Sequence, residues 1–305
     1  MANRQFSNLD LSNYEIPACT LTGRKSFIDF PWGSYHLNLT APIRVVKCTE
    51  TGLLYLCPRP NKKNRELLLQ GNIPAVLREY GEQTYNYASI DQQRVPDYEK
   101  RMKLIEEIIK AASVRSILDL GCSSGNFLEI AERAGWNAVG VEPYFEDVVK
   151  CQKKQLDVIQ SMAESLPFLD NTFLVVHSNH VFEHLEDPLA AAKEIFRVLK
   201  PGGLIFIEVP NQLDNFGFHR DMLFRAIQQR NRDISSIHHL WFFGRITLKS
   251  LMKQAGFKNI KIQNIFPKPV KGWRYPFSLM SQILARIRYG SYIIRGLGYK
   301  PSESD

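Results

Sequence analysis

The sequence predicts a doubly wound α/β fold, with a mostly parallel sheet between helices and a small β-rich segment at the N-terminus. From Ser116 onward, short apolar runs alternate with helical patterns, and the first run ends in a glycine turn. Residues 1–95, in contrast, show few helical periods. Strands of four to seven residues separated by helices indicate β-α-β units, whose right-handed crossovers give an open parallel sheet.

Bulk properties limit the class of protein. The 305 residues leave room for one large α/β domain and a smaller appendage, and 44% hydrophobic with 23% charged residues is typical of a soluble globular chain. No run of about 18 apolar residues occurs, and residues 1–15 lack an apolar signal core, so we expect no transmembrane helix and no signal peptide. The five irregularly spaced cysteines favour a reducing cytoplasm.

The expected elements follow one another in order. A first helix begins near Asp97, where Tyr98, Met102, Ile105 and Ile109 have helical spacing. The strands expected after it are 116–121, 137–143, 156–160, 172–178, 204–210 and 258–266. Helices are expected at 124–135, from Asp187 to Leu199 with Pro188 at the first position, and at 247–255.

An insertion interrupts this alternation. Residues 211–237 come directly after the strand that ends at Pro210. Open α/β sheets bind ligands at the carboxyl ends of their strands. We therefore expect the insertion to cover a substrate.

A glycine turn carries the chemistry. Asp119–Phe127, DLGCSSGNF, lies at a strand-to-helix turn, where Gly121 permits the tight turn and Gly125 lets the helix pack closely. Glu142 ends the next strand, where a carboxylate can accept hydrogen bonds from both hydroxyls of a ribose. Asn126 stands where a dinucleotide-binding loop would have its third glycine, which argues against a pyrophosphate.

From Ser116 to about Phe266 the chain resembles the class I S-adenosylmethionine-dependent methyltransferases. The motifs are LDLGCSSG, the VEP strand end, AESLPF, VFEHLEDP, the helix end LKPGG and IEVPN, in the order and spacing of that family. The resemblance implies a Rossmann-like methyltransferase domain over residues 96–266. It also implies that the cofactor is S-adenosylmethionine (SAM).

The resemblance further implies which residues bind SAM. They follow successive strands: Asp119, Gly121, Cys122, Ser123 and Gly125 for the methionine part, Glu142 for the ribose, Met162, Ala163 and Glu164 for the adenine, and Asn179 and His180 near the sulfonium. Met162 stands where the family often has an acid, and Leu174 where it usually has Asp. Backbone N–H groups can bind the adenine instead.

The catalytic candidates lie in His238–Phe257. This segment resembles methyltransferases of sugars and related natural products, in which residues matching His239, and sometimes His238, act in acid–base chemistry. Methyl transfer from a sulfonium is a direct displacement, so the enzyme supplies alignment and, where needed, a base. Imidazole, with an ordinary pKa near ~6.5, suits deprotonation of a hydroxyl. The structural alternative is that these histidines cap the next helix or stack on Trp241.

The first functional hypothesis is therefore O-methylation of a sugar, glycan or other small natural-product acceptor, with His239 as the base. The alternatives are a non-catalytic SAM-fold binding protein and an RNA methyltransferase. We expect His184 to be structural and His177 to be a hydrogen-bonded core residue.

Residues 1–95 resemble a degenerate zinc ribbon of the kind that some methyltransferases carry first. A ribbon needs two C-x-x-C knuckles. Cys19 and Cys48 each begin one, but Thr22 and Thr51 replace the second cysteines. We therefore expect apolar packing and no metal.

The net charge of +8 is concentrated at the C-terminal end. From Gly256 onward nine basic and two acidic residues give +7. Apolar residues recur there with helical spacing, at Phe277, Met280, Ile283 and Ile287. We expect residues 267–305 to form a basic amphipathic tail, which either packs on the domain or makes a peripheral contact with an anionic membrane or substrate. Nucleic acid is not favoured, because no RNA-binding module is recognisable.

Overall fold

The computed structural model describes residues 14–35, 43–62, 87–109, 114–212, 239–265 and 291–302. The chain forms two compact units, each built from several segments. Unit 1 consists of Met1–Asn61, Asn179–Lys193 and Phe206–Gly298, and unit 2 of Lys62–Ser178, Glu194–Ile205 and Tyr299–Asp305.

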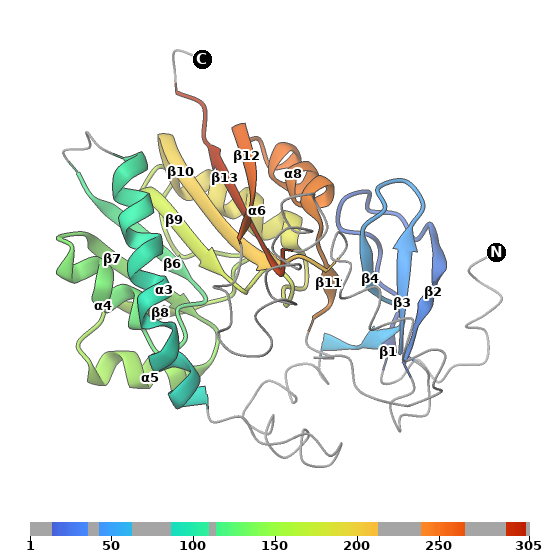
Figure 1. Cartoon of the computed structure of the whole chain (residues 1–305), viewed down its shortest axis with the longest axis horizontal. Coiled ribbons are helices and arrows are strands. Elements are labelled where there is room, and N and C mark those ends of the chain that lie inside the picture. Colours follow the sequence, from blue (N-terminus) through green and yellow to red (C-terminus); the bar gives the residue numbers. More distant parts are fainter. Residues whose placement is uncertain are drawn as a thin grey trace, which may run out of the picture. The chain divides into compact units, whose positions relative to one another are not determined.

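The described residues include a seven-stranded sheet with the strand order β12-β13-β10-β9-β6-β7-β8 (Figure 1). Strand β6 (Ser116–Leu120) pairs in parallel with both β7 (Asn137–Glu142) and β9 (Phe173–Asn179), and β7 pairs in parallel with β8 (Val158–Gln160). These four strands belong to the series predicted from the apolar runs. The α/β fold with a mostly parallel sheet is thus confirmed.

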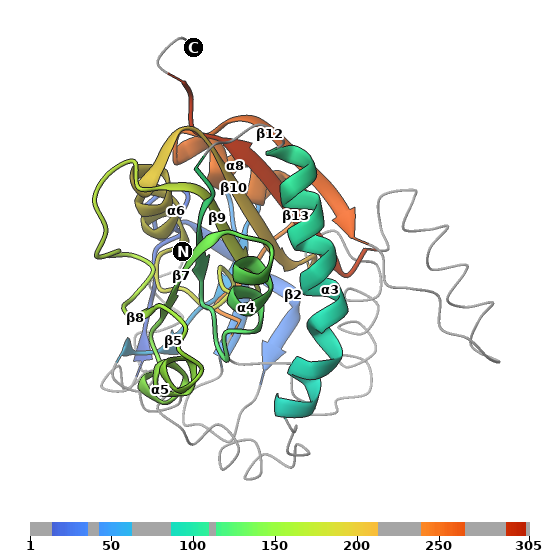
Figure 2. The same ribbon diagram turned by 90° about the vertical axis from the view of Figure 1, so that its left-hand side faces the viewer.

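The remaining strands of this sheet are β10 (Leu199–Pro210), β12 (Lys258–Ile265) and β13 (Ile293–Tyr299). The helices are α3 (Tyr87–Ile108), α4 (Asn126–Arg133), α5 (Phe145–Lys153), α6 (Pro188–Val198) and α8 (Arg245–Gln254). In unit 2, α4 packs on β6 and β7, and α3 lies beside α4 (Figure 2). None of the helices within the described ranges combines the length and apolar character needed to cross a bilayer.

Unit 1 contains the predicted β-rich N-terminal segment. Its antiparallel sheet has the order β11-β4-β3-β2, formed by β2 (Phe27–Tyr35), β3 (Ile43–Cys48), β4 (Leu54–Leu56) and β11 (Trp241–Phe242). A second pair joins β1 (Tyr14–Glu15) to β5 (Arg59–Pro60). Strand β11 comes from far along the sequence, and its Trp241 ring packs 5.4 Å from that of Tyr55. The segment that contains His239 is therefore attached to the N-terminal sheet.

The two expected knuckles have the same backbone geometry. Gly23 N–H donates to Cys19 O at 2.8 Å and Gly52 N–H donates to Cys48 O at 3.0 Å, and both glycines have positive φ, 66° and 74°. Cys19 Sγ lies 3.7 Å from Thr51 Oγ1 of the other turn. The turn geometry is thus retained in both knuckles, although Thr22 and Thr51 stand in place of the second cysteines. The relation to a zinc ribbon stays a prediction.

Three expected boundaries differ from the structure by more than two residues. Strand β10 begins at Leu199 instead of residue 204 and contains the KPGG sequence that we expected to lie between helix and strand. Helix α3 already begins at Tyr87 and continues through Pro96, so Asp97 is not its cap, although Met102 and Ile105 are buried as expected. The sheet also extends beyond residue 266, because Ile293–Tyr299 forms β13 inside it. Its sequence, IIRGLGY, contains two glycines and an arginine, which hide the strand pattern. Residues 213–238 and 266–290, which hold most of the substrate cover and of the tail, lie outside the described residues.

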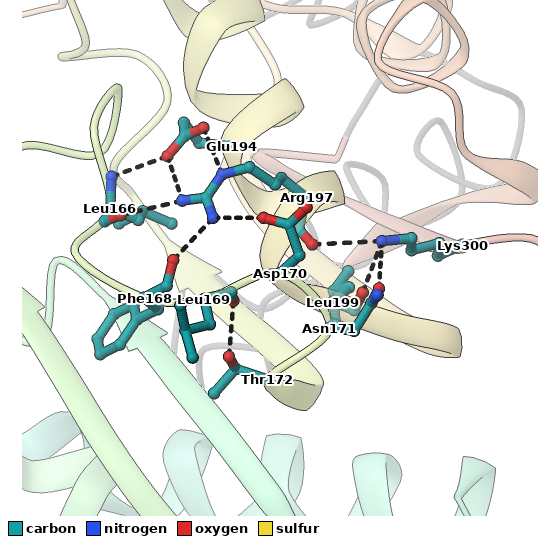
Figure 3. Close-up of polar contacts among 10 residues, drawn as sticks. All are labelled: Leu166, Phe168, Leu169, Asp170, Asn171, Thr172, Glu194, Arg197, Leu199 and Lys300. Atoms are coloured by element: carbon teal, nitrogen blue, oxygen red, sulfur yellow. Dashed lines mark hydrogen bonds and ion pairs between the residues drawn. The ribbon is translucent and has the colours of Figure 1, made fainter.

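Arg197 in α6 organises the loop before β9 (Figure 3). Its guanidinium forms two hydrogen bonds with the Glu194 carboxylate, at 2.9 and 2.8 Å. It also donates to the backbone oxygens of Phe168 at 2.7 Å and Leu166 at 3.0 Å. Glu194 in turn accepts the N–H of Leu166 at 3.0 Å. The chain after the predicted adenine-binding residues is therefore held to α6 by two side chains.

Lys300 closes the end of α6 in the same part of unit 2 (Figure 3). Its ammonium donates to the backbone oxygens of Arg197 at 3.2 Å and Leu199 at 2.9 Å, and to Asn171 Oδ1 at 2.7 Å. A cation at a helix C-terminus interacts favourably with the helix dipole. At least this basic residue of the predicted tail is thus used within the fold.

Replacing Arg197 with alanine is expected to lower the free energy of unfolding by about 2 kcal/mol, because Glu194 and two carbonyls lose a charged donor. Urea denaturation measures this loss, and Lys193→Ala, an exposed change in the same helix, should stay within about 0.5 kcal/mol. The hydrogen bond from Arg197 lowers the pKa of Glu194. The contribution of the Arg197–Glu194 pair to stability is therefore complete above the ordinary carboxylate pKa. It is lost as the pH falls through the lowered pKa of Glu194. An unchanged unfolding midpoint in Arg197→Ala would contradict this role.

Candidate active site

The glycine turn after β6 has the geometry expected of a cofactor loop. Gly121 and Gly125 have φ of 71° and 80°, and Ser123 lies in the same left-handed region at 47°. A Cβ added to Gly125 would lie 2.4 Å from Leu156 Cδ1 and 3.0 Å from Cys151 Sγ. Only glycine therefore allows α4 to start this close to its neighbours.

Glu142 at the end of β7 is held by this turn. Its Oε2 accepts the N–H of Ser123 at 2.9 Å, and its Oε1 accepts the N–H of Tyr144 at 3.2 Å. The side chain is buried. Burial raises the pKa of the carboxyl to about 7, despite the two N–H donors, which act to lower it. The predicted ribose-binding residue is thus placed beside the predicted methionine-binding turn.

Asp119, the other acidic residue of the motif, is buried at the end of β6. Its Oδ1 lies 2.7 Å from Nδ1 of His177 on the adjacent strand β9. The His177 ring stacks on Phe127 at 3.8 Å between centroids. His177 is therefore the hydrogen-bonded core residue that we expected, and it orients Asp119.

The predicted adenine-binding residues follow β8. Ala163 is buried, whereas Met162 is 45% exposed. Ser161 Oγ donates to Ser165 O at 2.9 Å across this short segment. Together with the Arg197 network, this contact fixes the backbone that would face an adenine.

The residues in unit 2 fit the nucleoside part of SAM. A carboxylate offers about four lone-pair sites, and the two oxygens of Glu142 each accept one backbone N–H, so both keep capacity for a ribose hydroxyl. Hydroxyl donors would also favour the charged form of a carboxylate that burial penalises. The site residues implied by the sequence are thus chemically consistent with SAM, and their roles remain proposals.

Asn179 and His180 belong to unit 1 and directly follow the predicted strand at 172–178. His180 has a positive φ of 56°, which is uncommon for a non-glycine residue, and its N–H donates to Glu208 O at 2.9 Å. Its Nδ1 lies 3.0 Å from Oε1 of Glu183. This contact ties the predicted sulfonium-side residue to a buried carboxylate.

His239, the first catalytic candidate, lies in a cluster around that carboxylate in unit 1. The His239 and His184 rings are 4.8 Å apart and nearly perpendicular, and His184 Nε2 lies 3.8 Å from Glu183 Oε1. Gln212 Nε2 lies 3.1 Å from His239 Nδ1. The structure therefore places His184 beside the candidate base, and its structural role stays a prediction. His238, the second candidate, lies outside the described residues.

Glu183 carries the negative charge of this cluster. Burial acts to raise the pKa of Glu183, but the hydrogen bond from His180 and the charges of the surrounding histidines prevail and lower it to about 2. Sequence reasoning missed both Glu183 and Gln212. The H-x-x-E-H spacing of residues 180–184 was the available signal for Glu183, whereas nothing local marks Gln212.

Fold and site together define a class I SAM-dependent methyltransferase domain. Residues 87–262 match the family model described as "Methyltransferase domain". The chain belongs to this methyltransferase family.

Individual relatives agree with this assignment. A probable S-adenosylmethionine-dependent methyltransferase of Mycobacterium tuberculosis is 25% identical over 199 residues, which is 64% of this chain and 67% of that protein. An uncharacterized methyltransferase of Mycobacterium sp. (strain KMS) is 35% identical over 107 residues, 34% of this chain and 42% of its own length. The ubiquinone/menaquinone biosynthesis C-methyltransferase UbiE of Cronobacter sakazakii is 32% identical over 124 residues, 36% of this chain and 49% of its own. The chain thus spans less than half the length of these last two.

Solved structures show the same fold. A SAM-dependent methyltransferase from Archaeoglobus fulgidus superimposes with a TM-score of 0.50 at 21% identity, over 71% of this chain and 100% of that one. A phosphoethanolamine N-methyltransferase of Haemonchus contortus, in complex with S-adenosylhomocysteine, gives 0.53 at 14% identity, over 82% of this chain and 63% of that one.

Proposed function

We propose that the protein transfers a methyl group from SAM to a hydroxyl oxygen of a sugar, glycan or other small natural-product acceptor, and that His239 receives the hydroxyl proton. The observation that carries the proposal is the imidazole of His239 in a cluster around the buried carboxylate of Glu183. A base that gains a proton becomes cationic, and a nearby fixed negative charge stabilises it. Oxygen acceptors require such a base more than neutral amines do.

Each part of the chain has a defined task in this reaction. Bound SAM supplies an electrophilic methyl group. Glu142 and the turn at Gly121–Gly125 bind the cofactor, and the Arg197 network fixes the segment that faces the adenine. His239 takes the proton, so that the acceptor oxygen attacks as an alkoxide-like nucleophile and S-adenosylhomocysteine leaves.

The orientation of the Gln212 amide determines which ring nitrogen of His239 is basic. An amide nitrogen donates, so in the arrangement with Gln212 Nε2 on Nδ1 the neutral ring carries its proton on Nε2. Half a turn of the amide presents Oε1 instead, which is buried and has no partner among the described residues. Oε1 then accepts the proton of Nδ1, and Nε2 is the basic atom.

The test is acceptor-dependent release of S-adenosylhomocysteine with a panel of nucleotide sugars, glycosides and phenols. With SAM labelled with ¹³C in the methyl group, NMR distinguishes an oxygen-bound methyl carbon from one bound to carbon or nitrogen. We expect an O-methyl product. A C-methyl or N-methyl product, as the names of UbiE and the Haemonchus enzyme describe for those proteins, would refute the proposal for oxygen.

Replacing His239 with alanine is expected to lower kcat about 100-fold or more and to leave SAM affinity unchanged, because general-base catalysis contributes about 10²–10⁴-fold. Stopped assays give kcat, and calorimetric titration gives the affinity. Glu186→Gln, a change in the 183–187 loop outside the histidine cluster, is the control. A His239→Ala variant with full kcat would exclude His239 as the base.

A further inference from the structure

Glu183 has two carboxylate oxygens in different situations. The side chain has no exposed surface, and Oε1 lies 3.0 Å from His180 Nδ1. Oε2 is buried and has no hydrogen-bond partner among the described residues. A buried charged oxygen without a partner is costly, and native proteins rarely keep one unless an ion or water satisfies it. Oε2 is therefore available to an ion or a water molecule.

Two imidazoles converge with this carboxylate in unit 1. One ligand atom from each of Glu183, His184 and His239 lies within 4.8 Å of the other two, and Glu183 Oε1 lies 3.8 Å from His184 Nε2. A tetrahedral ion with bonds of about 2.1 Å holds its ligand atoms about 3.4 Å apart. The Glu183–His184 separation of 3.8 Å thus exceeds this distance by about 0.4 Å, and the upper bound of 4.8 Å exceeds it by about 1.4 Å. Rotation of His184, which is 37% exposed, can close much of this difference.

The backbone keeps these side chains together. Glu183 O accepts the N–H groups of both Leu240 at 2.7 Å and Trp241 at 3.2 Å. Trp241 Nε1 donates to Leu185 O at 2.8 Å. Backbone hydrogen bonds therefore join the segments that carry Glu183 and His239, although these are distant in sequence. The cluster is thus preorganised by the fold.

We propose that Glu183, His184 and His239 bind one divalent transition-metal ion, with further coordination positions left for the acceptor hydroxyl and water. Two imidazoles and one carboxylate suit Zn²⁺, Mn²⁺, Fe²⁺ or Co²⁺, whereas Mg²⁺ and Ca²⁺ prefer oxygen ligands alone. Three protein ligands and an open position are the pattern of catalytic rather than structural metal sites. Such a site would differ from the absence of a metal that the sequence led us to expect.

The ion would activate the acceptor. This step rests on the proposed methyl transfer to oxygen and replaces only its proton acceptor, His239. An ion-bound hydroxyl has a lowered pKa and loses its proton to water, so His239 acts as a ligand instead of as the free base. The new O–CH₃ bond then forms as the S–CH₃ bond of SAM breaks. One proton and neutral S-adenosylhomocysteine are released. No oxidant or reductant takes part.

Gln212 would orient the His239 ligand. When Oε1 of Gln212 accepts the Nδ1 proton, Nε2 presents its lone pair to the ion, and such a partner of a metal-bound histidine is typical. Gln212→Ala should therefore weaken metal binding about 10-fold, a loss within the range measured for comparable partners.

The experiment uses the full-length protein stripped with a chelator and then titrated with Co²⁺, Zn²⁺, Mn²⁺ or Mg²⁺. We expect one equivalent of Zn²⁺ by calorimetry, intense visible d–d absorption with Co²⁺, and much weaker binding of Mg²⁺. Glu183→Gln and His184→Gln should each weaken Zn²⁺ binding at least about 100-fold, since even partners of ligands cost 10–100-fold. Glu186→Gln should bind normally.

Two controls keep the result specific. Cys19 and Cys48 are the alternative site for Zn²⁺, so Cys48→Ser should leave the Co²⁺ spectrum unchanged, and a sulfur-to-cobalt charge-transfer band would place the ion there instead. His184 is partly exposed, so His184→Gln tests the site if circular dichroism shows that Glu183→Gln does not fold. A Co²⁺ spectrum equal to that of the free ion, or Zn²⁺ binding unchanged in His184→Gln, would overturn the proposal.

The same samples separate this inference from the proposed function. Chelation should lower acceptor-dependent release of S-adenosylhomocysteine at least about tenfold without changing SAM affinity. If the protein binds no ion but His239→Ala still loses turnover, the metal proposal fails and O-methylation by a histidine base stands. If the ion binds and no methyl group leaves SAM, the metal site stands and the proposed function fails.

Discussion

Replacing Glu142 with alanine is expected to weaken binding of SAM and of S-adenosylhomocysteine about 100-fold or more, which corresponds to about 2.7 kcal/mol. The carboxylate is placed by the N–H groups of Ser123 and Tyr144, and each oxygen keeps capacity for a ribose hydroxyl. Hydrogen bonds to a charged acceptor contribute about 1.5–3 kcal/mol each, so two of them account for the loss. Calorimetric titration with S-adenosylhomocysteine measures it without turnover.

Glu146→Ala is the matched control, because it removes a carboxylate from the exposed face of the next helix, α5. It should leave the affinity unchanged. Glu142→Ala loses two backbone contacts but also removes a carboxylate that burial penalises, so its melting temperature should change little. A folded Glu142→Ala protein that binds S-adenosylhomocysteine as the wild type does would show that Glu142 does not contact the ribose.

The affinity should also depend on pH in a defined direction. Burial raises the pKa of Glu142 to about 7, and only the carboxylate can accept from both hydroxyls, so affinity should fall as the pH drops below about 7. The free energy of unfolding should change in the opposite sense and decrease as the pH rises. The penalty for burying the charge of Glu142 is absent below the ordinary carboxylate pKa and complete above the raised pKa of about 7. Glu142→Gln should remove this pH dependence of binding.

The central part of the fold was predictable because its signals are local. Strands β6, β7 and β9 are apolar runs of ordinary length, and the turn before α4 contains the glycine that it requires, Gly125. Strand β13 was not predicted, because Gly296 and Gly298 interrupt its apolar pattern. It is a strand because it pairs with its neighbours β12 and β10. Long-range pairing, which the sequence does not display, decides such cases.

The candidate site likewise contains a part that local sequence signals predict and a part that depends on long-range pairing. Asp119 and Glu142 end predicted strands, so their approach to one turn follows from strand order. The cluster of Glu183, His184 and His239 depends instead on backbone bonds from Leu240 and Trp241 to Glu183, which join distant segments. Nothing local in the sequence indicates that His239 lies beside His184.

The interior ion pair of unit 1 gives the largest expected effect on stability. Arg295 on β13 donates to Glu208 Oε1 of β10 from Nε at 2.7 Å and from Nη2 at 2.5 Å, and the guanidinium lies 4.7 Å from the Phe206 ring centroid. The two side chains are 13% and 1% exposed. Replacing Arg295 with methionine should lower the free energy of unfolding by about 3–5 kcal/mol, because the buried carboxylate of Glu208 then loses the guanidinium that contacts it.

Urea denaturation of three variants tests this explanation. The double variant Glu208→Leu/Arg295→Met should be markedly more stable than Arg295→Met alone, since an apolar pair leaves no unpaired charge. Arg24→Met is the matched control: Arg24 forms an ion pair with Glu50 at 3.2 Å but is 71% exposed, so its loss should cost less than about 1 kcal/mol. If the double variant is as unstable as Arg295→Met, the cost comes from lost packing against Phe206 rather than from a buried carboxylate that has lost Arg295.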